Sequence, residues 1–196
     1  LPTGAVVQHM DSLVGVLRKK IEALPFGKDI NLIVTSDHGM TDISPERVVN
    51  INDYVKPEWC EVIDGRTPTS IFSKPEYRDS ICNALKKAAH IHVWKKEEIP
   101  AELHYGSSDR IGDIVVAPEL GWQFTDVARD TKGAHGYFPQ SPDMQVMFRA
   151  IGPDFKRGYI SGGFVNVDIY PLLSHLLQIV PEKTDGQFKR IKEILR

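Results

Sequence analysis

One stretch of the chain, residues 31–40, joins a predicted buried strand to a polar turn. The apolar run at 32–34 stops before Asp37-His38-Gly39, as in a strand that delivers polar side chains to the end of a sheet. In open α/β sheets, ligands bind outside the carboxyl ends of the strands. A carboxylate and an imidazole side by side there suit a divalent metal ion, and Gly39 allows a sharp backbone turn. The alternative is a polar turn, without chemistry, after a core strand.

The remaining pattern predicts helices and strands in alternation. Apolar residues at steps of three and four predict helices over 4–24, 75–89, 167–179 and 184–196. Apolar or alternating runs predict strands over 30–35, 59–63, 69–72, 90–94, 111–117, 122–127 and 144–151. We expect the first helix to pack its apolar stripe on the sheet, and 41–49 to be a loop or short helix. The alternation predicts an α/β layered sandwich with a mostly parallel sheet and helices on both faces.

Composition excludes several classes of protein. The 196 residues are 41% hydrophobic and 26% charged, with a formal net charge of -2, which is ordinary for a globular domain and offers no basic bias toward nucleic acid. No apolar run approaches the roughly 20 residues that span a bilayer, and Leu1-Pro2-Thr3 lacks the regions of a signal peptide. Cys60 and Cys82 either pair in an oxidising compartment or stay as two small core residues.

Three residues are candidate metal ligands: Asp37, His38 and His135. Each lies beside a glycine in a loop that follows an apolar strand, and the loop at 130–142 holds His135 between two glycines. One carboxylate and two imidazoles suit Zn²⁺ or a similar ion. On spacing alone, a metal site and a pair of polar turns are equally good interpretations.

A second histidine pair lies on the strand predicted at 90–94. His90 and His92 would share one face of that strand and could bind a metal ion. We expect instead an exposed polar pair, with Ile91 and Val93 directed inward, because no third ligand lies nearby in the sequence.

Four motifs resemble those of one enzyme family. Residues 34–40 resemble the Asp-His-Gly-Met motif of the alkaline phosphatase superfamily, and most closely that of the nucleotide pyrophosphatase/phosphodiesterase family. Residues 133–137 resemble the later Gly-x-His-Gly-Tyr motif, residues 166–173 are similar to the closing helix, and 152–156 resemble the segment before it. The order and spacing of all four match over nearly the whole chain.

The resemblance implies a two-zinc enzyme that hydrolyses phosphodiester or pyrophosphate bonds in small nucleotide-type substrates rather than in a nucleic-acid polymer. By position, Asp37 and His38 would bind the zinc ion that also contacts the nucleophile, and His135 would bind the second. Two such ions, about 3.5–4 Å apart, clamp the attacking and leaving oxygens. The family uses a Thr or Ser nucleophile and forms a covalent nucleotidyl-enzyme.

The sequence departs from the family in what it lacks. No Thr or Ser matches the nucleophile motif, and further Asp and His ligands are missing, so residues 1–196 resemble the C-terminal half of the catalytic domain. We expect the N-terminal half to be its partner, and the chain alone to be inactive and to bind zinc weakly. Tyr137 either lines the substrate pocket or packs its loop. Relatives of this kind imply an extracytoplasmic location.

Other functions remain open on the sequence. Sulfatases, phosphonate hydrolases and ethanolamine-phosphate transferases share the metal frame of the superfamily, and a non-catalytic binding domain could keep the fold without the chemistry. The Gly-x-His-Gly-Tyr motif and the closing helix favour the phosphodiesterase, and the three intact ligand positions argue against a domain that has lost its chemistry.

Overall fold

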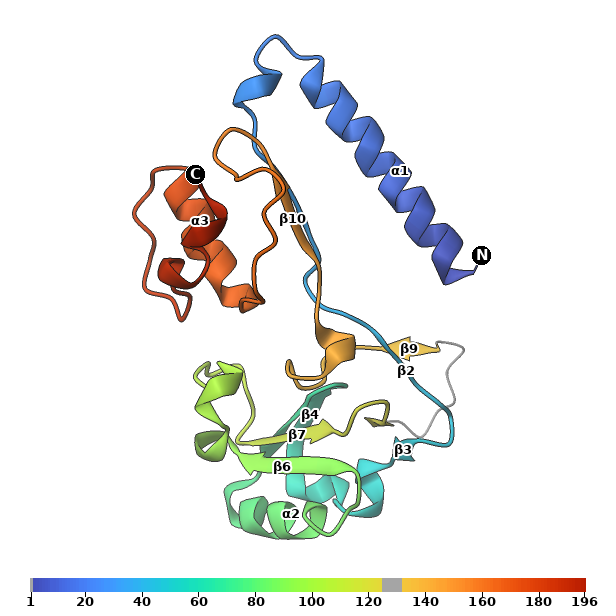
Figure 1. Ribbon diagram of the computed structural model, residues 1–196. Coiled ribbons are helices and arrows are strands. Elements are labelled where there is room, and N and C mark those ends of the chain that lie inside the picture. Colours follow the sequence, from blue (N-terminus) through green and yellow to red (C-terminus); the bar gives the residue numbers. More distant parts are fainter. Residues whose placement is uncertain (1, 125–131) are drawn as a thin grey trace. The chain divides into compact units, whose positions relative to one another are not determined.

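A computed structural model describes residues 2–124 and 132–196 (Figure 1). Its α-helices are α1 (Thr3–Glu22), α2 (Arg78–Leu85) and α3 (Ile169–Leu176). Its strands are β1 (Leu32–Thr35), β2 (Thr41–Asp42), β3 (Val48–Val49), β4 (Cys60–Gly65), β5 (Thr69–Ser73), β6 (Ile91–Lys95), β7 (Ile114–Pro118), β8 (Gln123–Phe124), β9 (Gly133–Ala134) and β10 (Phe148–Ile151). The chain forms two compact units: unit 1 is Leu1–Asp37 with Met147–Arg196, and unit 2 is His38–Val146.

The main sheet of unit 2 has four strands in the order β4-β5-β7-β6, and every neighbouring pair is antiparallel. The α/β class is confirmed, but the expectation of a mostly parallel sheet is wrong for the described strands, where only β3 and β8 pair in parallel. The reason lies in β7. The β5–α2–β6 segment has the crossover pattern of a parallel unit, but β7 inserts between the two strands and pairs antiparallel with both.

The core of unit 2 lies between this sheet and α2. Ile71 of β5 and Ile114 and Val116 of β7 are fully buried, and so are Ile81 and Leu85 of α2. Ile81 and Leu85 are four residues apart, so they share one face of the helix and cover one face of the sheet (Figure 1). Burying each such side chain contributes about 1.5–3 kcal/mol, which makes this cluster the main source of stability in unit 2.

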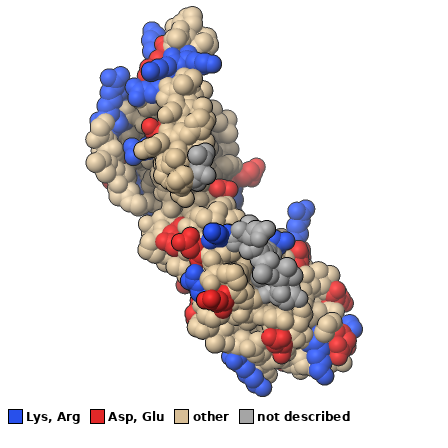
Figure 2. Space-filling model, turned by 90° about the vertical axis from the view of Figure 1, so that its right-hand side faces the viewer, with Lys and Arg blue, Asp and Glu red and all other residues tan. Residues whose placement is uncertain are grey.

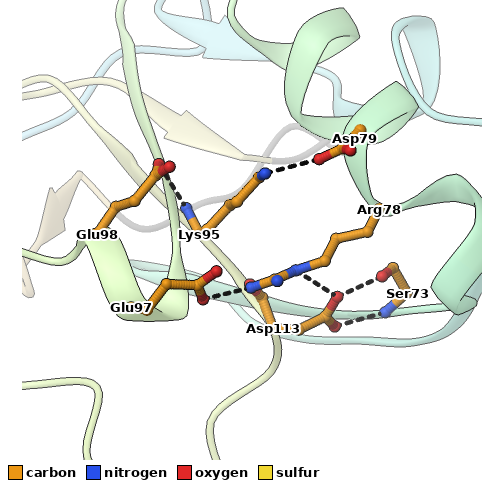
Figure 3. A network of polar contacts seen from close by, with 7 residues as sticks. All are labelled: Ser73, Arg78, Asp79, Lys95, Glu97, Glu98 and Asp113. Carbon is orange, nitrogen blue, oxygen red and sulfur yellow. Dashed lines mark hydrogen bonds and ion pairs between the residues drawn. The ribbon is translucent and has the colours of Figure 1, made fainter.

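A polar network closes one end of the same sheet (Figure 3). The Asp113 carboxylate accepts hydrogen bonds from the backbone N–H of Ser73 at 2.8 Å and from the Ser73 hydroxyl. Arg78, at the start of α2, donates to Glu97 at 2.5 Å and to the Asp113 carbonyl at 3.0 Å, while its Nε lies 3.4 Å from the Asp113 carboxylate. Asp113 therefore ties the end of β5 to α2 and to the start of β7.

Unit 1 is built on a two-stranded antiparallel sheet. β1 pairs with β10 in the register Leu32↔Ile151 to Thr35↔Phe148. Its core is smaller than that of unit 2 and is formed by residues from α3 and the C-terminal segment: Phe155, Leu172, Ile191 and Ile194.

Helix α1 forms where it is predicted, but it does not pack as predicted. The helix has no buried residue, although its sequence carries an apolar stripe at helical spacing. The expectation that this stripe lies on the sheet is therefore wrong for unit 1. Periodicity shows which face of a helix is apolar, but it does not show what covers that face.

Several shorter predictions change in the structure. The segment at 41–49 contains β2 and β3 rather than a loop or short helix, and the C-terminal segment forms two 3-10 turns, Phe188–Arg190 and Lys192–Ile194, rather than one helix. β8 pairs with β3 instead of beside β7, and the rest of the strand predicted at 122–127 lies outside the described residues. In the described part of the chain, no helix is both long and apolar enough to span a bilayer.

Candidate functional site

The predicted ligand Asp37 follows β1 in unit 1. It is exposed, its carboxylate accepts a hydrogen bond from the Ser36 hydroxyl at 3.4 Å, and its backbone carbonyl accepts one from the Asn166 side chain, also at 3.4 Å. The boundary between the two units falls between Asp37 and His38. The contact with Asn166 attaches the end of β1 to the segment that leads into α3, which is another of the motifs found in the sequence.

His38 and His135, the other two predicted ligands, lie together in unit 2. Their rings are stacked, with centroids 3.6 Å apart and an angle of 13° between the planes. The pairing of β2 with β9, in which Thr41 faces Ala134, brings the two motifs together. Two segments separated by almost a hundred residues thus place their histidines in direct contact.

The orientation of the His38 ring is set by the neighbouring backbone. Its Nδ1 lies 2.9 Å from the carbonyl oxygen of Gly39. A carbonyl only accepts hydrogen bonds, so this contact requires a proton on Nδ1, and in the neutral ring the lone pair is then on Nε2. A backbone carbonyl that holds one ring nitrogen in this way is the usual arrangement for a metal-binding histidine.

Position 39 requires glycine because the structure leaves no room for a side chain there, and not because its backbone φ angle is unusual. A Cβ atom on this residue would lie 1.9 Å from the carbonyl oxygen of Asp143. The backbone N–H groups of Gly39 and Met40 donate to the carbonyls of Met144 at 3.2 Å and Asp143 at 2.9 Å. The Thr41 hydroxyl donates to the Asp143 carboxylate at 2.5 Å. The turn at 142–144 therefore forms a rigid support behind His38, which the sequence pattern did not reveal.

The loop that carries His135 is also fixed by close backbone contact. Gly136 has φ +93°, and a Cβ atom there would lie 2.1 Å from the carbonyl oxygen of Thr67. Tyr137 is 7% exposed and donates its hydroxyl hydrogen to the Trp122 carbonyl at 2.7 Å, and burial raises the pKa of this phenol. These contacts favour the loop-packing role over the pocket-lining role for Tyr137.

The second histidine pair is held by aromatic neighbours. His90 stacks on Trp122 at 3.7 Å and has its Nδ1 2.8 Å from Glu119, while His92 stacks on Trp94 at 5.6 Å. His92 also lies edge-on to Phe138, with ring centroids 4.8 Å apart. Both histidines are exposed, as expected for a polar pair, and their rings pack on aromatic neighbours. Ile91 and Val93 pack against the core, as expected for the inward face of β6.

The two cysteines are free thiols in the structure. Cys82 is buried on α2 and Cys60 is half-buried at the start of β4, and both contact the core of unit 2. Burial raises the pKa of each thiol. Of the two alternatives left by the sequence, the structure therefore matches the pair of small core residues.

The donor set fits part of a two-metal site. A carboxylate and two imidazoles are ordinary zinc ligands, but two four-coordinate ions need more donors than these three. Within 2–124 and 132–196, no group of three or more His, Cys, Asp or Glu side chains is arranged to hold a metal ion. The three predicted ligands are therefore too few for a complete two-metal site.

Comparison with known proteins identifies relatives over almost the whole chain. A profile described as "Type I phosphodiesterase / nucleotide pyrophosphatase" matches residues 3–138. The bovine (Bos taurus) "Bis(5'-adenosyl)-triphosphatase ENPP4" is 34% identical over 192 residues, which are 97% of this chain and 42% of that protein. The human (Homo sapiens) "Ectonucleotide pyrophosphatase/phosphodiesterase family member 5" is 32% identical over 98% of this chain and 41% of its own length. The chain thus spans less than half of these relatives.

Solved structures give the same result. Murine ectonucleotide pyrophosphatase/phosphodiesterase 5 superposes with a TM-score of 0.89 at 33% identity, covering 98% of this chain and 52% of that chain. A second structure of the murine protein, in an inactive form, is a complex with AMP. The fold is therefore that of about half of the matched structure.

Proposed function

The chain belongs to the type I phosphodiesterase/nucleotide pyrophosphatase family, and from this we propose that it supplies part of the metal site of an enzyme that hydrolyses phosphodiester or pyrophosphate bonds. The observation that carries the proposal is the stacking of His38 on His135, because it joins the two family motifs in one place. The proposed ligands are Asp37, His38 and His135. Nucleotide-type substrates are proposed because relatives are named for nucleotide hydrolysis and one is solved with AMP.

The geometry of the histidine pair supports two ions rather than one. The rings are 3.6 Å apart and nearly parallel, and paired ions in two-metal sites lie roughly 3.5–4 Å apart. Two stacked rings with this separation can each contribute a nitrogen to a different ion. When bound, a pair of zinc ions would activate the nucleophile and offset charge on the phosphoryl oxygens.

This chain's own residues have positioning roles in the proposal. The Gly39 carbonyl sets the tautomer of His38, and the turn at 142–144 keeps the His38 backbone in place. The β2–β9 pairing holds His135 against His38. We propose that the Thr or Ser nucleophile and the remaining ligands come from the family's N-terminal half-domain, and that the complete enzyme works outside the cytoplasm.

The test is hydrolysis of a nitrophenyl ester of a nucleotide by the complete domain that contains this chain. We expect Asp37→Asn and His135→Ala each to lower kcat by about 100-fold or more and to lower the zinc content measured by elemental analysis. His9→Ala is the matched control, since this histidine is exposed on α1 and lies outside both motifs, and this variant should keep its metal and most of its activity.

Other outcomes would identify a different function. Normal turnover by the Asp37→Asn and His135→Ala variants would refute the proposed ligands. A metal-loaded domain that cleaves sulfate or phosphonate esters but no nucleotide diester would place the protein in another branch of the superfamily. A complete domain with neither metal nor activity would indicate a binding protein. The 196-residue chain alone should show negligible turnover.

A further inference from the structure

Two histidines at the start of β6, His90 and His92, are not among the proposed metal ligands. Lys and Arg are interspersed with Asp and Glu on the face of unit 2 that Figure 2 presents, so no patch of one charge marks a binding surface there. The contacts of the two histidines lead to another part of unit 2. Each ring packs on an aromatic side chain, and each is connected to the residues that follow His135.

His92 contacts the loop of His135 directly. Its ring lies edge-on to Phe138, with centroids 4.8 Å apart and 87° between the planes. Trp94 lies two residues further on, on the same face of β6, and meets Phe138 in a similar edge-on contact at 5.9 Å. Edge-to-face packing is a favoured arrangement of aromatic rings. Phe138, three residues after His135, is therefore held by two rings of one strand.

His90 is connected to the same loop through Trp122. The two rings stack with centroids 3.7 Å apart and 8° between the planes, and the Trp122 carbonyl accepts the hydroxyl hydrogen of Tyr137 at 2.7 Å. The turn that leads to Trp122 is also fixed on His90. The backbone N–H of Glu119 donates to the His90 carbonyl at 2.9 Å, and its carboxylate lies 2.8 Å from the Nδ1 of His90. A shift of His90 would therefore move the acceptor of the Tyr137 hydroxyl.

The backbone of His90 has an unusual conformation that these contacts maintain. Its φ angle is +64°, in the left-handed region that few residues other than glycine adopt. Such a conformation persists where the surrounding structure holds it. The contacts with Glu119 and Trp122 provide that support at the position where β6 begins its pairing with β7.

The loop of His135 is thus anchored at three consecutive residues. Gly136 lies against the Thr67 carbonyl, Tyr137 donates to Trp122, and Phe138 packs on β6. His135 itself is exposed, so the position of its ring depends on how the neighbouring residues are held. Metal affinity is sensitive to small displacements of a ligand, because the ligands must reach the ion at fixed distances.

We propose that His90 and His92 are positioning residues for His135. Acting through Tyr137 and Phe138, they keep the His135 ring in its stacked position beside His38. The inference rests on the proposed function, in which His135 is a metal ligand. It assigns a role to the histidine pair that is neither metal binding nor an incidental feature of the surface.

The first measurement needs no metal. Hydrogen exchange of the segment 132–140 is followed by mass spectrometry in the complete domain that contains this chain, in EDTA. We expect His90→Ala and His92→Ala to accelerate exchange of this segment by about threefold or more, because each removes an anchor of the loop. His92→Phe keeps a ring edge-on to Phe138 and should retain the slow exchange.

The second measurement connects the loop to the metal. Competition with a chelator gives the zinc affinity of the same variants. We expect His90→Ala and His92→Ala to raise the dissociation constant of at least one zinc ion by about tenfold and to lower kcat accordingly. His92→Phe should restore both quantities, and His135→Ala is the reference for loss of the ligand itself.

The matched control is Tyr77→Ala, which removes another stacked ring of unit 2. Tyr77 packs on Trp59 with centroids 5.7 Å apart and contacts the core on the α2 side of the sheet. This variant should lower the stability of unit 2 but leave the zinc affinity and the exchange of 132–140 within about twofold of the unsubstituted domain, because it shares no partner with the loop.

Three results would overturn the inference. The first is unchanged exchange of 132–140 in both alanine variants. The second is faster exchange with unchanged zinc affinity, while His135→Ala lowers that affinity. The third is an equal loss of zinc in Tyr77→Ala, which would indicate general loss of stability. Full zinc content in His135→Ala would instead refute the proposed function, and exchange in EDTA would still decide whether the two histidines hold the loop.

Discussion

Single residues hold the turn that carries His38 in unit 2 in place, and Gly39 is the clearest case. The carbonyl of Asp143 occupies the space where a side chain would begin, 1.9 Å from an ideal Cβ position. The backbone around Gly39 is also joined to the turn at 142–144, because the N–H groups of Gly39 and Met40 donate hydrogen bonds to its carbonyls. Neither segment can move away without losing those bonds, so the contact cannot be relieved by a side-chain rotation.

We predict that Gly39→Ala destabilises unit 2 by about 3 kcal/mol, at the upper end of the usual range for single substitutions, because backbone must shift. Urea unfolding followed by tryptophan fluorescence would measure it, since Trp59, Trp94 and Trp122 all lie in this unit. Gly133→Ala is the control in the same unit, because the nearest atoms to its Cβ position, at 3.1 and 3.2 Å, belong to the flexible side chain of Met40 rather than to backbone. Equal stability of the two variants would contradict the close contact.

Asp168 is a fully buried carboxylate in unit 1. Arg190 donates to it from Nη2 at 2.6 Å and from Nε at 2.8 and 3.0 Å, and the backbone N–H of Gln187 donates at 2.7 Å. Burial by itself would raise the pKa of Asp168, but the hydrogen bonds from Arg190 and Gln187 outweigh it and hold the pKa below its usual value. The charged form is therefore the one that stabilises the fold.

A lowered pKa in the folded state gives a defined pH dependence. The stability contributed by Asp168 is fully present above its unfolded pKa of about 3.9, and it is lost as the pH falls through the folded value. We predict that Asp168→Asn costs unit 1 about 2 kcal/mol at pH 7, and that the difference from the unsubstituted chain shrinks below pH ~4. Urea midpoints at several pH values would measure it.

The matched control for this prediction is the exposed pair Arg18–Glu22 on α1, whose side chains are 53% and 55% exposed at 2.7 Å separation. Glu22→Gln should change stability by no more than about 0.5 kcal/mol at any pH, because a surface ion pair is largely solvated. Two results would show that the buried Asp168–Arg190 pair is not the source of the pH-dependent stability. One is a large change in stability on Glu22→Gln, and the other is a loss of stability on Asp168→Asn that does not vary with pH.

At the scale of elements, Asp113 is the junction that orders one end of the main sheet. It joins the end of β5, the start of α2 and the start of β7 (Figure 3). Its carbonyl also accepts a hydrogen bond from the backbone N–H of Lys96 at 2.9 Å. Because the four strands are interleaved rather than consecutive, their alignment depends on such contacts between elements as well as on the strand pairing itself.

We predict that Asp113→Ala destabilises unit 2 by about 1–2 kcal/mol, because Ser73 loses its acceptor and the Nε of Arg78 loses the carboxylate it faces; the partial exposure of Asp113 and Arg78 keeps the cost moderate. Asp79→Asn, which removes an exposed partner of Lys95 in the same region, should leave stability unchanged. Thermal unfolding by circular dichroism distinguishes them. Identical melting curves for both variants would show that the junction contributes little.

On the scale of the whole molecule, the two compact units differ in how completely they are built. Unit 2 has a four-stranded sheet and the larger buried cluster, whereas unit 1 has a two-stranded sheet, the smaller cluster and an uncovered helix. Local stability follows buried apolar contact and the protection of backbone hydrogen bonds. The units are therefore expected to respond separately to denaturant.

We predict two unfolding transitions for the isolated chain, with unit 1 unfolding first. In native-state hydrogen exchange, amides of β5, β7 and α2 should be the slowest and those of α1 the fastest. One cooperative transition with equal protection in both units would contradict this picture.

The sequence by itself determined most of the local elements, the α/β class and the motifs whose resemblance predicted the family. Periodicity over 4–24 and the apolar run of β7 depend on nearby residues, so they can be read directly from the chain. In the helix predicted over 167–179, Leu172 is fully buried whereas Leu173 and Leu177 are 39% and 68% exposed. The helical pattern shows which side of the helix is apolar, but it does not show how much of that side is buried.

Only the tertiary structure decided which segments meet. It paired β8 with β3, inserted β7 between β5 and β6, and stacked His38 on His135. It also placed the Asp143 carbonyl where Gly39 would carry a side chain. These contacts join residues far apart in the chain, and their energies depend on register and close packing, which a local pattern does not contain. The exposed apolar face of α1 has the same explanation, because the sequence of a helix shows which face is apolar but not which other residues pack against it.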